Sequence, residues 1–254
     1  MKLQKMTINQ FTTDGLIIRE QQIGENDKLI TILSRNYGVI RCYASGAMSI
    51  KSKKCAATSL LAYSSFTIKK KGENNSLIEA SPIQLFFKSG ADIEKLSLAQ
   101  YFCDLCLNYA PTEETCEDVL RLLLNSLYFL VEKNINIFLI KAIFELRFMS
   151  LIGYMPNLVA CQQCAAYESD IMYFDTSEGV IYCAECTEYK SNFAVINKTL
   201  ITSFRHIVYS ELKKLFAFSI PDDAAKALSL ITEKFVVNKT ENRLKTLDFF
   251  NSLF

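Results

Sequence analysis

Four cysteines in the second half of the chain have the spacing of a metal site. Two CxxC pairs, Cys161–Cys164 and Cys183–Cys186, are separated by eighteen residues, a spacing typical of zinc ribbons. Four thiolates complete a closed tetrahedral site that leaves no open position for a substrate. Two short apolar segments lie between the pairs, at residues 171–174 and 180–182. They predict a hairpin that turns at Glu178-Gly179. The pattern predicts one structural Zn²⁺ per chain, with the ligands Cys161, Cys164, Cys183 and Cys186.

Five further cysteines bring the total to nine. An odd and unevenly spread set is not the pattern of a secreted disulfide framework, and it indicates a reducing cytosol. Cys103 and Cys106 also form a CxxC pair, but they lie inside an expected helix, where free thiols pack well in a core. Core packing is also the interpretation for Cys42, Cys55 and Cys116. For the quartet, two unrelated thiol pairs remain the alternative.

Patterns for catalysis are missing from the sequence. His206 is the single histidine, so any Ser-His-Asp or Cys-His mechanism would have to use it. Neither a GxxxxGK[ST] phosphate loop nor a GxGxxG dinucleotide loop occurs. We therefore expect that the protein is not an enzyme. A nucleic-acid hydrolase is a third hypothesis, which the single histidine and the closed zinc site disfavour.

The first third of the chain has the pattern of β-structure. Turn-forming residues separate five short apolar or alternating segments, and the expected strands are 15–19, 28–33, 38–43, 64–70 and 76–80. Five strands within residues 1–87 fit a small barrel, such as the OB fold that commonly binds nucleic acid. The number of strands alone does not separate an OB fold from an SH3-like barrel.

This β-module is also basic. Residues 1–80 carry twelve Lys/Arg and six Asp/Glu, whereas the whole chain has a net charge of +1. A basic module on an acidic body is typical of a polyanion-binding protein, and a chance distribution of surface charge is the alternative. Aromatic residues among the cations could stack on bases. The predicted DNA-binding residues are Arg19, Lys28, Arg35, Arg41, Lys51, Lys53, Lys54, Lys69, Lys70 and Lys71.

Helical periodicity replaces the β pattern from residue 92. The expected helices are 92–109, 112–133, 135–152, 198–216 and 221–237, the last capped by Ser219, with a closing segment at 242–254. We predict an α+β fold in which a five-stranded OB-type β-barrel precedes a helical bundle with an inserted zinc ribbon. The predicted domains are 1–87 for the barrel, 88–156 for the helical domain, 157–190 for the ribbon and 191–254 for the helices that complete the helical domain.

The sequence gives no sign of membrane targeting. The first residues lack the apolar run of a secretory signal. No segment approaches the roughly 20 uncharged apolar residues of a spanning helix. We therefore expect a cytoplasmic protein.

Several sequence blocks, taken in order, resemble one known family. Residues 15–19 (GLIIR), 24–28 (GENDK) and 37–38 (YG) resemble the N-terminal signature of the RecO recombination mediators. Residues 144–156 resemble the helix that leads into that family's zinc motif, and the cysteine quartet follows where the family places it. The closing residues 243–249 (RLKTLDF) resemble its final motif. The match covers nearly the whole chain.

The resemblance implies a function in DNA repair and homologous recombination. RecO-like proteins bind single- and double-stranded DNA and anneal complementary strands. With RecR they load RecA onto strands coated by single-strand-binding protein. The resemblance thus implies a nucleoid-associated bacterial mediator with these partners. The competing hypothesis is a zinc-ribbon protein-interaction scaffold without annealing activity, and a steep salt dependence of DNA binding would distinguish the two.

The resemblance also implies contact with the acidic, Phe-ended tail of single-strand-binding protein. Such a tail needs an apolar slot rimmed by cations. The cations predicted for this slot are Arg121, Lys141 and Arg147, in the second and third expected helices. The alternative is that each is a snorkelling surface residue.

Overall fold

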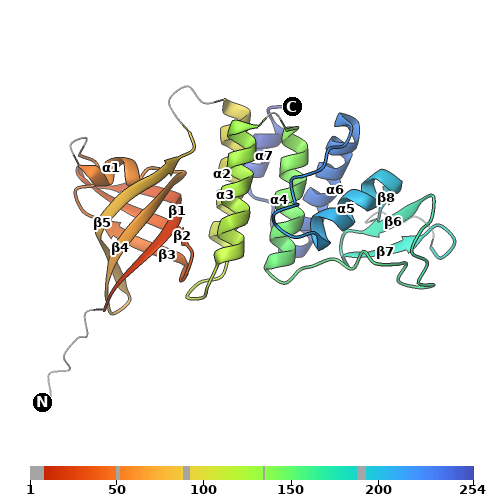
Figure 1. Cartoon of the computed structure of the whole chain (residues 1–254), viewed down its shortest axis with the longest axis horizontal. Coiled ribbons are helices and arrows are strands. Elements are labelled where there is room, and N and C mark those ends of the chain that lie inside the picture. Colours follow the sequence, from red (N-terminus) through yellow and green to blue (C-terminus); the bar gives the residue numbers. More distant parts are fainter. Residues whose placement is uncertain (1–8, 50–51, 88–91, 134, 188–192) are drawn as a thin grey trace, which may run out of the picture. The chain divides into compact units, whose positions relative to one another are not determined.

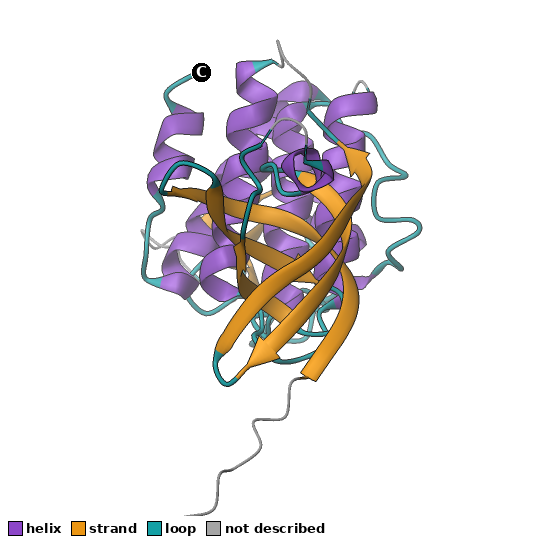
Figure 2. Ribbon diagram, turned by 90° about the vertical axis from the view of Figure 1, so that its left-hand side faces the viewer, coloured by secondary structure: helices purple, strands orange, loops and turns teal. Residues whose placement is uncertain are grey.

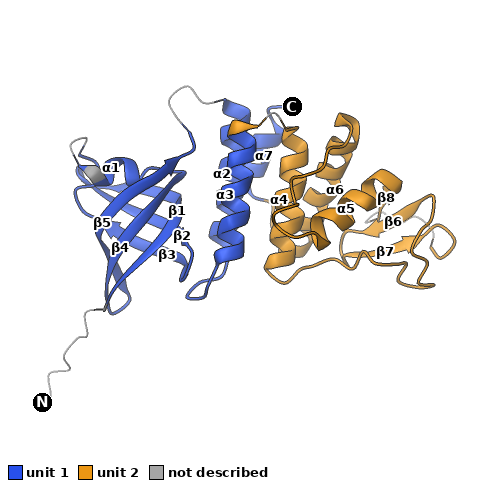
Figure 3. Ribbon diagram, in the orientation of Figure 1, with its two compact units in different colours: residues 1–131, 244–254 blue, residues 132–243 orange. Residues whose placement is uncertain are grey.

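A computed structural model describes residues 9–49, 52–87, 92–133, 135–187 and 193–254. The chain forms two compact units, which Figure 3 distinguishes by colour. Unit 1 contains residues 1–131 and 244–254, and unit 2 contains residues 132–243. The chain therefore leaves unit 1 once and returns to it at its end.

Unit 1 begins with a closed five-stranded barrel (Figures 1 and 2). Its strands are β1 (Asn9–Ile23), β2 (Asp27–Ser34), β3 (Gly38–Ala44), β4 (Ala62–Lys71) and β5 (Asn74–Leu85). They follow the order β1-β2-β3-β5-β4, and β1 closes the barrel against β4. The pairing of β3 with β5 is parallel, and the other pairings are antiparallel. The OB-like barrel is confirmed, and every strand is longer than predicted.

Alternation along the strands builds the barrel core. Side chains such as Ile30, Ile32, Ile40 and Phe66 point inward and are buried, so their strand neighbours face outward. A short helix, α1 (Lys53–Ala57), lies between β3 and β4, begins at the N-cap Ser52 and packs on β4 and β5. The sequence did not predict this helix.

Three helices complete unit 1: α2 (Ile93–Tyr109), α3 (Glu117–Glu132) and α7 (Lys245–Asn251). Both β1 and α7 pack against α2. The segment between α2 and α3 is extended and hydrogen-bonds to the barrel, since the N–H of Val39 donates to Pro111 O (3.0 Å) and that of Glu113 donates to Tyr37 O (3.1 Å). This pairing with the barrel explains why α3 starts later than the predicted residue 112.

Unit 2 combines three helices with a small sheet. The helices are α4 (Ile137–Leu151), α5 (Lys198–Tyr209) and α6 (Asp222–Thr240), and the strands are β6 (Met172–Asp175), β7 (Val180–Cys183) and β8 (Phe193–Ile196) in the order β7-β6-β8. The predicted hairpin is β6–β7, whereas β8 was not predicted. The N-cap of α6 is Pro221 without a side-chain cap, so the predicted cap Ser219 is wrong.

The apolar helix α4 lies in the core of unit 2. It packs against α5 and α6, and Ile140, Phe144 and Phe148 are fully buried. This burial confirms the central position expected for a helix that is apolar on most faces. Within the described ranges, no helix combines the length and apolar character needed to cross a bilayer.

Candidate nucleic-acid interface and metal centre

A row of cations lies on the outer surface of the barrel. Arg19 on β1 pairs with Thr31 on β2, and Thr31 pairs with Arg41 on β3. Residues paired directly across antiparallel strands point to the same side of the sheet. Both arginines are exposed, whereas Thr31 between them is 4% exposed. The row therefore carries two positive charges, one on either side of a buried position.

A second row continues this surface onto β4. Tyr43 pairs with Leu29 on β2 and with Ser76 on β5, and Ser76 pairs with Lys69 on β4. Lys71 follows two residues after Lys69 and is exposed at the β4–β5 turn. The outer surface of strands β2 and β3 and the β4–β5 loop are the parts with which OB folds bind oligonucleotides. We refer to the four cations of these rows as the basic face: Arg19, Arg41, Lys69 and Lys71.

An exposed aromatic ring lies within the basic face. Tyr43 is 38% exposed, and its hydroxyl donates to the Asp27 carboxylate. The other oxygen of Asp27 accepts the N–H of Gly46 (2.8 Å) and the hydroxyl of Ser45 (3.2 Å). The hydrogen bond from Tyr43 lowers the pKa of Asp27, and the same bond raises the pKa of Tyr43. The tyrosine therefore stays neutral near pH 7.

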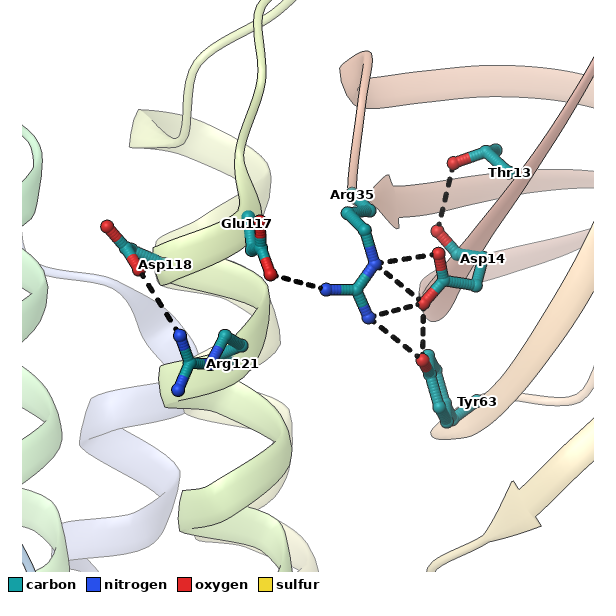
Figure 4. Close-up of polar contacts among 7 residues, drawn as sticks. All are labelled: Thr13, Asp14, Arg35, Tyr63, Glu117, Asp118 and Arg121. Atoms are coloured by element: carbon teal, nitrogen blue, oxygen red, sulfur yellow. Dashed lines mark hydrogen bonds and ion pairs between the residues drawn. The ribbon is translucent and has the colours of Figure 1, made fainter. Parts of the chain in front are cut away.

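Arg35 forms ion pairs with β1 and with the start of α3, all within unit 1. Its guanidinium contacts Asp14 at 2.7 Å and Glu117 at 2.9 Å, and the Tyr63 hydroxyl also donates to Asp14 (Figure 4). The hydrogen bond from Arg35 holds the pKa of Asp14 below its usual value. Asp14 and Glu117 thus accept from N–H groups at two edges of the guanidinium, and the DNA contact of Arg35 stays a prediction.

Burial contradicts the DNA contact predicted for Lys28. It is 8% exposed, and its Nζ lies 2.7 Å from Glu20 Oε2. Two further predicted lysines have partners within unit 1. Lys70 is exposed with its Nζ 3.9 Å from Glu113 Oε1, and Lys54 donates to Leu77 O at 3.3 Å. Lys51 and the side chain of Lys53 fall outside the described residues.

The structure brings the four predicted metal ligands together. The Sγ atoms of Cys161, Cys164, Cys183 and Cys186 all lie within 4.8 Å of one another, and those of Cys164 and Cys183 are 3.6 Å apart. Zn–S bonds of about 2.3 Å in a tetrahedron place sulfurs about 3.8 Å apart. Four thiols at this spacing fit a tetrahedral metal ion, and a disulfide, with sulfurs about 2 Å apart, does not match it.

The protonation of these thiols also favours a cation. Burial raises the pKa of the Cys161 thiol, but backbone hydrogen bonds, including one from the N–H of Cys183 (3.3 Å), outweigh burial and lower the pKa to about 6. Hydrogen bonds with Cys164 and Cys183 raise the pKa of Cys186. One thiolate therefore forms readily, and a cation would favour loss of the remaining protons.

Arg205 fastens the cysteine-bearing loop to α5. Its Nε donates to Leu158 O at 2.8 Å, its Nη2 donates to Val159 O at 3.0 Å and to Tyr167 O at 2.7 Å, and its guanidinium lies 4.0 Å from the centre of the Tyr167 ring. Sequence reasoning missed this residue because its partners are backbone carbonyls, which no side-chain pattern reveals.

Lys141 is buried and cannot line the predicted pocket for an acidic tail. This lysine is 1% exposed and lies 2.9 Å from Glu145 and 3.1 Å from Glu233, so it is corrected to a core residue. Arg147 is partly buried and donates to the carbonyls of Ile207 and Val208 near the end of α5. Arg121 belongs to unit 1 and is half-buried, with its side chain 42% exposed and 4.0 Å from Asp118 of its own helix.

The remaining cysteines and the histidine have structural surroundings. Cys42, Cys103, Cys106 and Cys116 are buried as predicted, whereas Cys55 is only partly buried. Burial raises the pKa of Cys42 to about 12 and that of Cys116 to about 11, so these thiols stay protonated and unreactive. His206 Nε2 lies 3.0 Å from Lys214 O, and its ring packs on Phe218.

Comparison with known proteins covers almost the whole chain. The family described as recombination protein O N terminal matches residues 6–86, and recombination protein O C terminal matches residues 90–248. A protein of Acetivibrio thermocellus called DNA repair protein RecO is 30% identical over 97% of this chain and 98% of its own. A protein of the same name from Caldicellulosiruptor bescii is 28% identical, over 94% and 96%. The N-terminal and C-terminal family models match consecutive parts of the chain, in the expected order. The chain therefore belongs to the recombination protein O (RecO) family.

Proposed function

We propose that this protein acts in DNA repair and recombination as a mediator that binds DNA through the basic face of its barrel. The observation that supports the proposal is the register of the strands. It puts Arg41 and Lys69 on the outward side of the sheet beside Tyr43, with Arg19 on the same side across the buried Thr31. Surface cations bind phosphates, which both single- and double-stranded DNA carry. Such contacts do not depend on the base sequence.

Annealing of complementary strands follows from the same contacts. Two strands repel each other through their phosphates, and a protein that neutralises phosphates without engaging base-pairing edges lowers that repulsion. We therefore propose that the protein anneals strands without ATP and without covalent catalysis. The recombinase would then be loaded on DNA that this protein holds.

The test compares two triple variants with the same change in net charge. Reversing Arg19, Arg41 and Lys69 to glutamate removes the basic face, whereas reversing Lys213, Lys234 and Lys245 changes exposed lysines elsewhere. We expect the first variant to lose DNA affinity by at least about tenfold and to flatten its salt dependence, and the second to bind within about threefold of the wild type. Equal loss in both would show that only net charge matters. Absent or salt-independent binding by the wild type would favour the protein-interaction scaffold.

We also propose that the cysteine quartet holds one structural Zn²⁺. The ion would complete a closed site that ties the loop at Cys161–Cys164 to strand β7, and it would serve folding rather than reaction. Metal analysis of the protein purified without chelator should give one zinc per chain, and Cys161→Ser should remove it. A fully folded protein without metal, or another metal at full occupancy, would refute the assignment.

Partners complete the proposed role. Family membership supports RecR, the tail of single-strand-binding protein and, indirectly, RecA as partners. Of the predicted tail-binding cations, Arg121 has an accessible side chain, 42% exposed, and its ion pair is with Asp118 of its own helix. Titration of a labelled acidic, Phe-ended peptide against the wild type and against Arg121→Ala tests this residue. If the two proteins bind the peptide with equal affinity, Arg121 is not part of the binding site for the tail.

A further inference from the structure

We infer that Tyr43 is a base-stacking residue that makes the basic face prefer unpaired strands over duplex. The inference deepens the proposed DNA binding and rests on it. In a duplex the flat faces of the bases are stacked on one another, whereas a single strand can turn a base toward an aromatic ring. A ring between phosphate-binding cations therefore adds affinity for single strands only.

The position of the ring fits this role. Arg41 lies two residues before Tyr43 on the same outward side of β3, a distance of about 7 Å along the strand. Lys69 lies two strands away in the row that contains Tyr43, about 10 Å across the sheet. Leu29, paired with Tyr43 on β2, supplies an apolar neighbour. A strand whose phosphates follow the cations would thus bring a base over the ring.

The ring is also held in place before any ligand arrives. Its hydroxyl donates to Asp27, and that carboxylate is itself fixed by the N–H of Gly46 and the hydroxyl of Ser45. A side chain that is ordered in the free protein loses little further freedom on binding, so more of the stacking energy appears as affinity. Other exposed tyrosines lie outside the basic face. Tyr128, for example, is 40% exposed on α3 and packs edge-on against Phe129.

The experiment measures affinity for three probes of equal length: a thymidine oligonucleotide, the same backbone without bases, and a duplex. We expect Tyr43→Ala and Tyr43→Leu to bind the thymidine strand about tenfold more weakly, the effect of one lost stacking contact. Both should bind the base-free strand and the duplex within about twofold of the wild type. Tyr43→Phe, which keeps the ring, should stay within about threefold on all probes. Tyr128→Ala is the matched control and should match the wild type.

The outcomes separate this inference from the proposed function. The inference fails if the wild type binds the base-free strand as tightly as the thymidine strand, a measurement that needs no variant. It also fails if Tyr43→Leu weakens all three probes alike, which would indicate a structural role. If the wild type binds none of the probes, both the proposed DNA binding and the inference about Tyr43 are wrong. Tyr43→Leu, which keeps apolar volume, answers the question even if Tyr43→Ala does not fold.

Discussion

Arg35 links three segments of unit 1 that are distant in the sequence. It contacts Asp14 on β1, Tyr63 on β4 and Glu117 at the start of α3 (Figure 4). Charge-assisted hydrogen bonds of this kind are stronger than neutral ones and fix geometry. The arginine therefore joins the barrel to the helix that follows it.

The first prediction concerns Asp14. Asp14→Asn removes the charge that Arg35 meets, and we expect it to lower the free energy of unfolding by about 2 kcal/mol at pH 7. The pKa of Asp14 is lowered in the folded protein, so its contribution is complete above its ordinary pKa of about 4 and disappears as the pH falls through the lowered value. Urea denaturation at several pH values should show the two proteins converging below pH 4. Glu25→Gln, at an exposed turn, should show no such convergence, and a pH-independent difference for Asp14→Asn would contradict the prediction.

The second prediction concerns Lys141, which lies between two buried carboxylates. Lys141→Met removes the cation that lies 2.9 Å from Glu145 and 3.1 Å from Glu233, although Arg243 still lies 2.9 Å from Glu233. We expect a loss of about 3–5 kcal/mol in the free energy of unfolding, mainly through Glu145. Lys234→Met, at an exposed position on α6, should cost less than about 0.5 kcal/mol. Replacing both glutamates by glutamine in the Lys141→Met background should recover part of the loss. No recovery would mean that packing, and not charge, is responsible.

At the scale of elements, a glycine fixes the junction between the barrel and the helices. Gly38 has φ +62°, and a Cβ at this position would lie 2.1 Å from Pro111 O. The segment between α2 and α3 can therefore approach β3 only because no side chain intervenes. Gly24 has nearly the same φ, +61°, but a Cβ there would meet no atom within 4 Å.

The third prediction uses this pair of glycines. Both Gly38→Ala and Gly24→Ala incur the left-handed backbone cost of about 1–2 kcal/mol. Gly38→Ala should cost a further 1–3 kcal/mol, about that of overpacking, because Pro111 has to move. Thermal denaturation monitored by circular dichroism measures both. Equal destabilisation would show that the segment at Pro111 contributes little to the fold.

Elements with strong local patterns were predictable from the sequence, and elements made by tertiary contacts were not. Alternation gave all five barrel strands, and the CxxC spacing brought the four thiols together. By contrast, β8 forms by pairing with β6, and the late start of α3 follows from pairing with the barrel. The pairing of Lys28 with Glu20 and of Lys141 with Glu233 could not be read from the sequence, because a cation's sequence position does not reveal its partner. The predicted boundaries of the four domains stay a prediction.

At the scale of the whole molecule, the basic face and the cysteine quartet belong to different units. Each unit has its own core: Ile30, Ile32 and Phe66 are buried in the barrel, whereas the Phe174 ring packs against Phe204 and Phe235 in unit 2. Each core is formed by residues of its own unit, so we expect a change in one core to leave the other intact.

The fourth prediction follows from this separation. Cys161→Ser should lose the metal and unfold unit 2 at a lower temperature, while affinity for single-stranded DNA stays within about twofold of the wild type. Calorimetry and fluorescence anisotropy on the same preparation would measure both effects. A parallel loss of DNA affinity would show that the two units depend on each other.

The return of the chain to unit 1 has a consequence during synthesis on the ribosome. Helix α7 packs against α2, where Leu247 and Phe250 are buried and Thr246 donates to Asp104 at 2.9 Å. The barrel strands emerge first and unit 2 is a continuous stretch, so both can fold as they appear. The contact between α2 and α7, however, can form only after residues 244–254 have been translated. A nascent chain that still lacks residues 244–254 therefore lacks the helix that packs against α2, and we expect it to be cleaved by proteases more readily than the full chain.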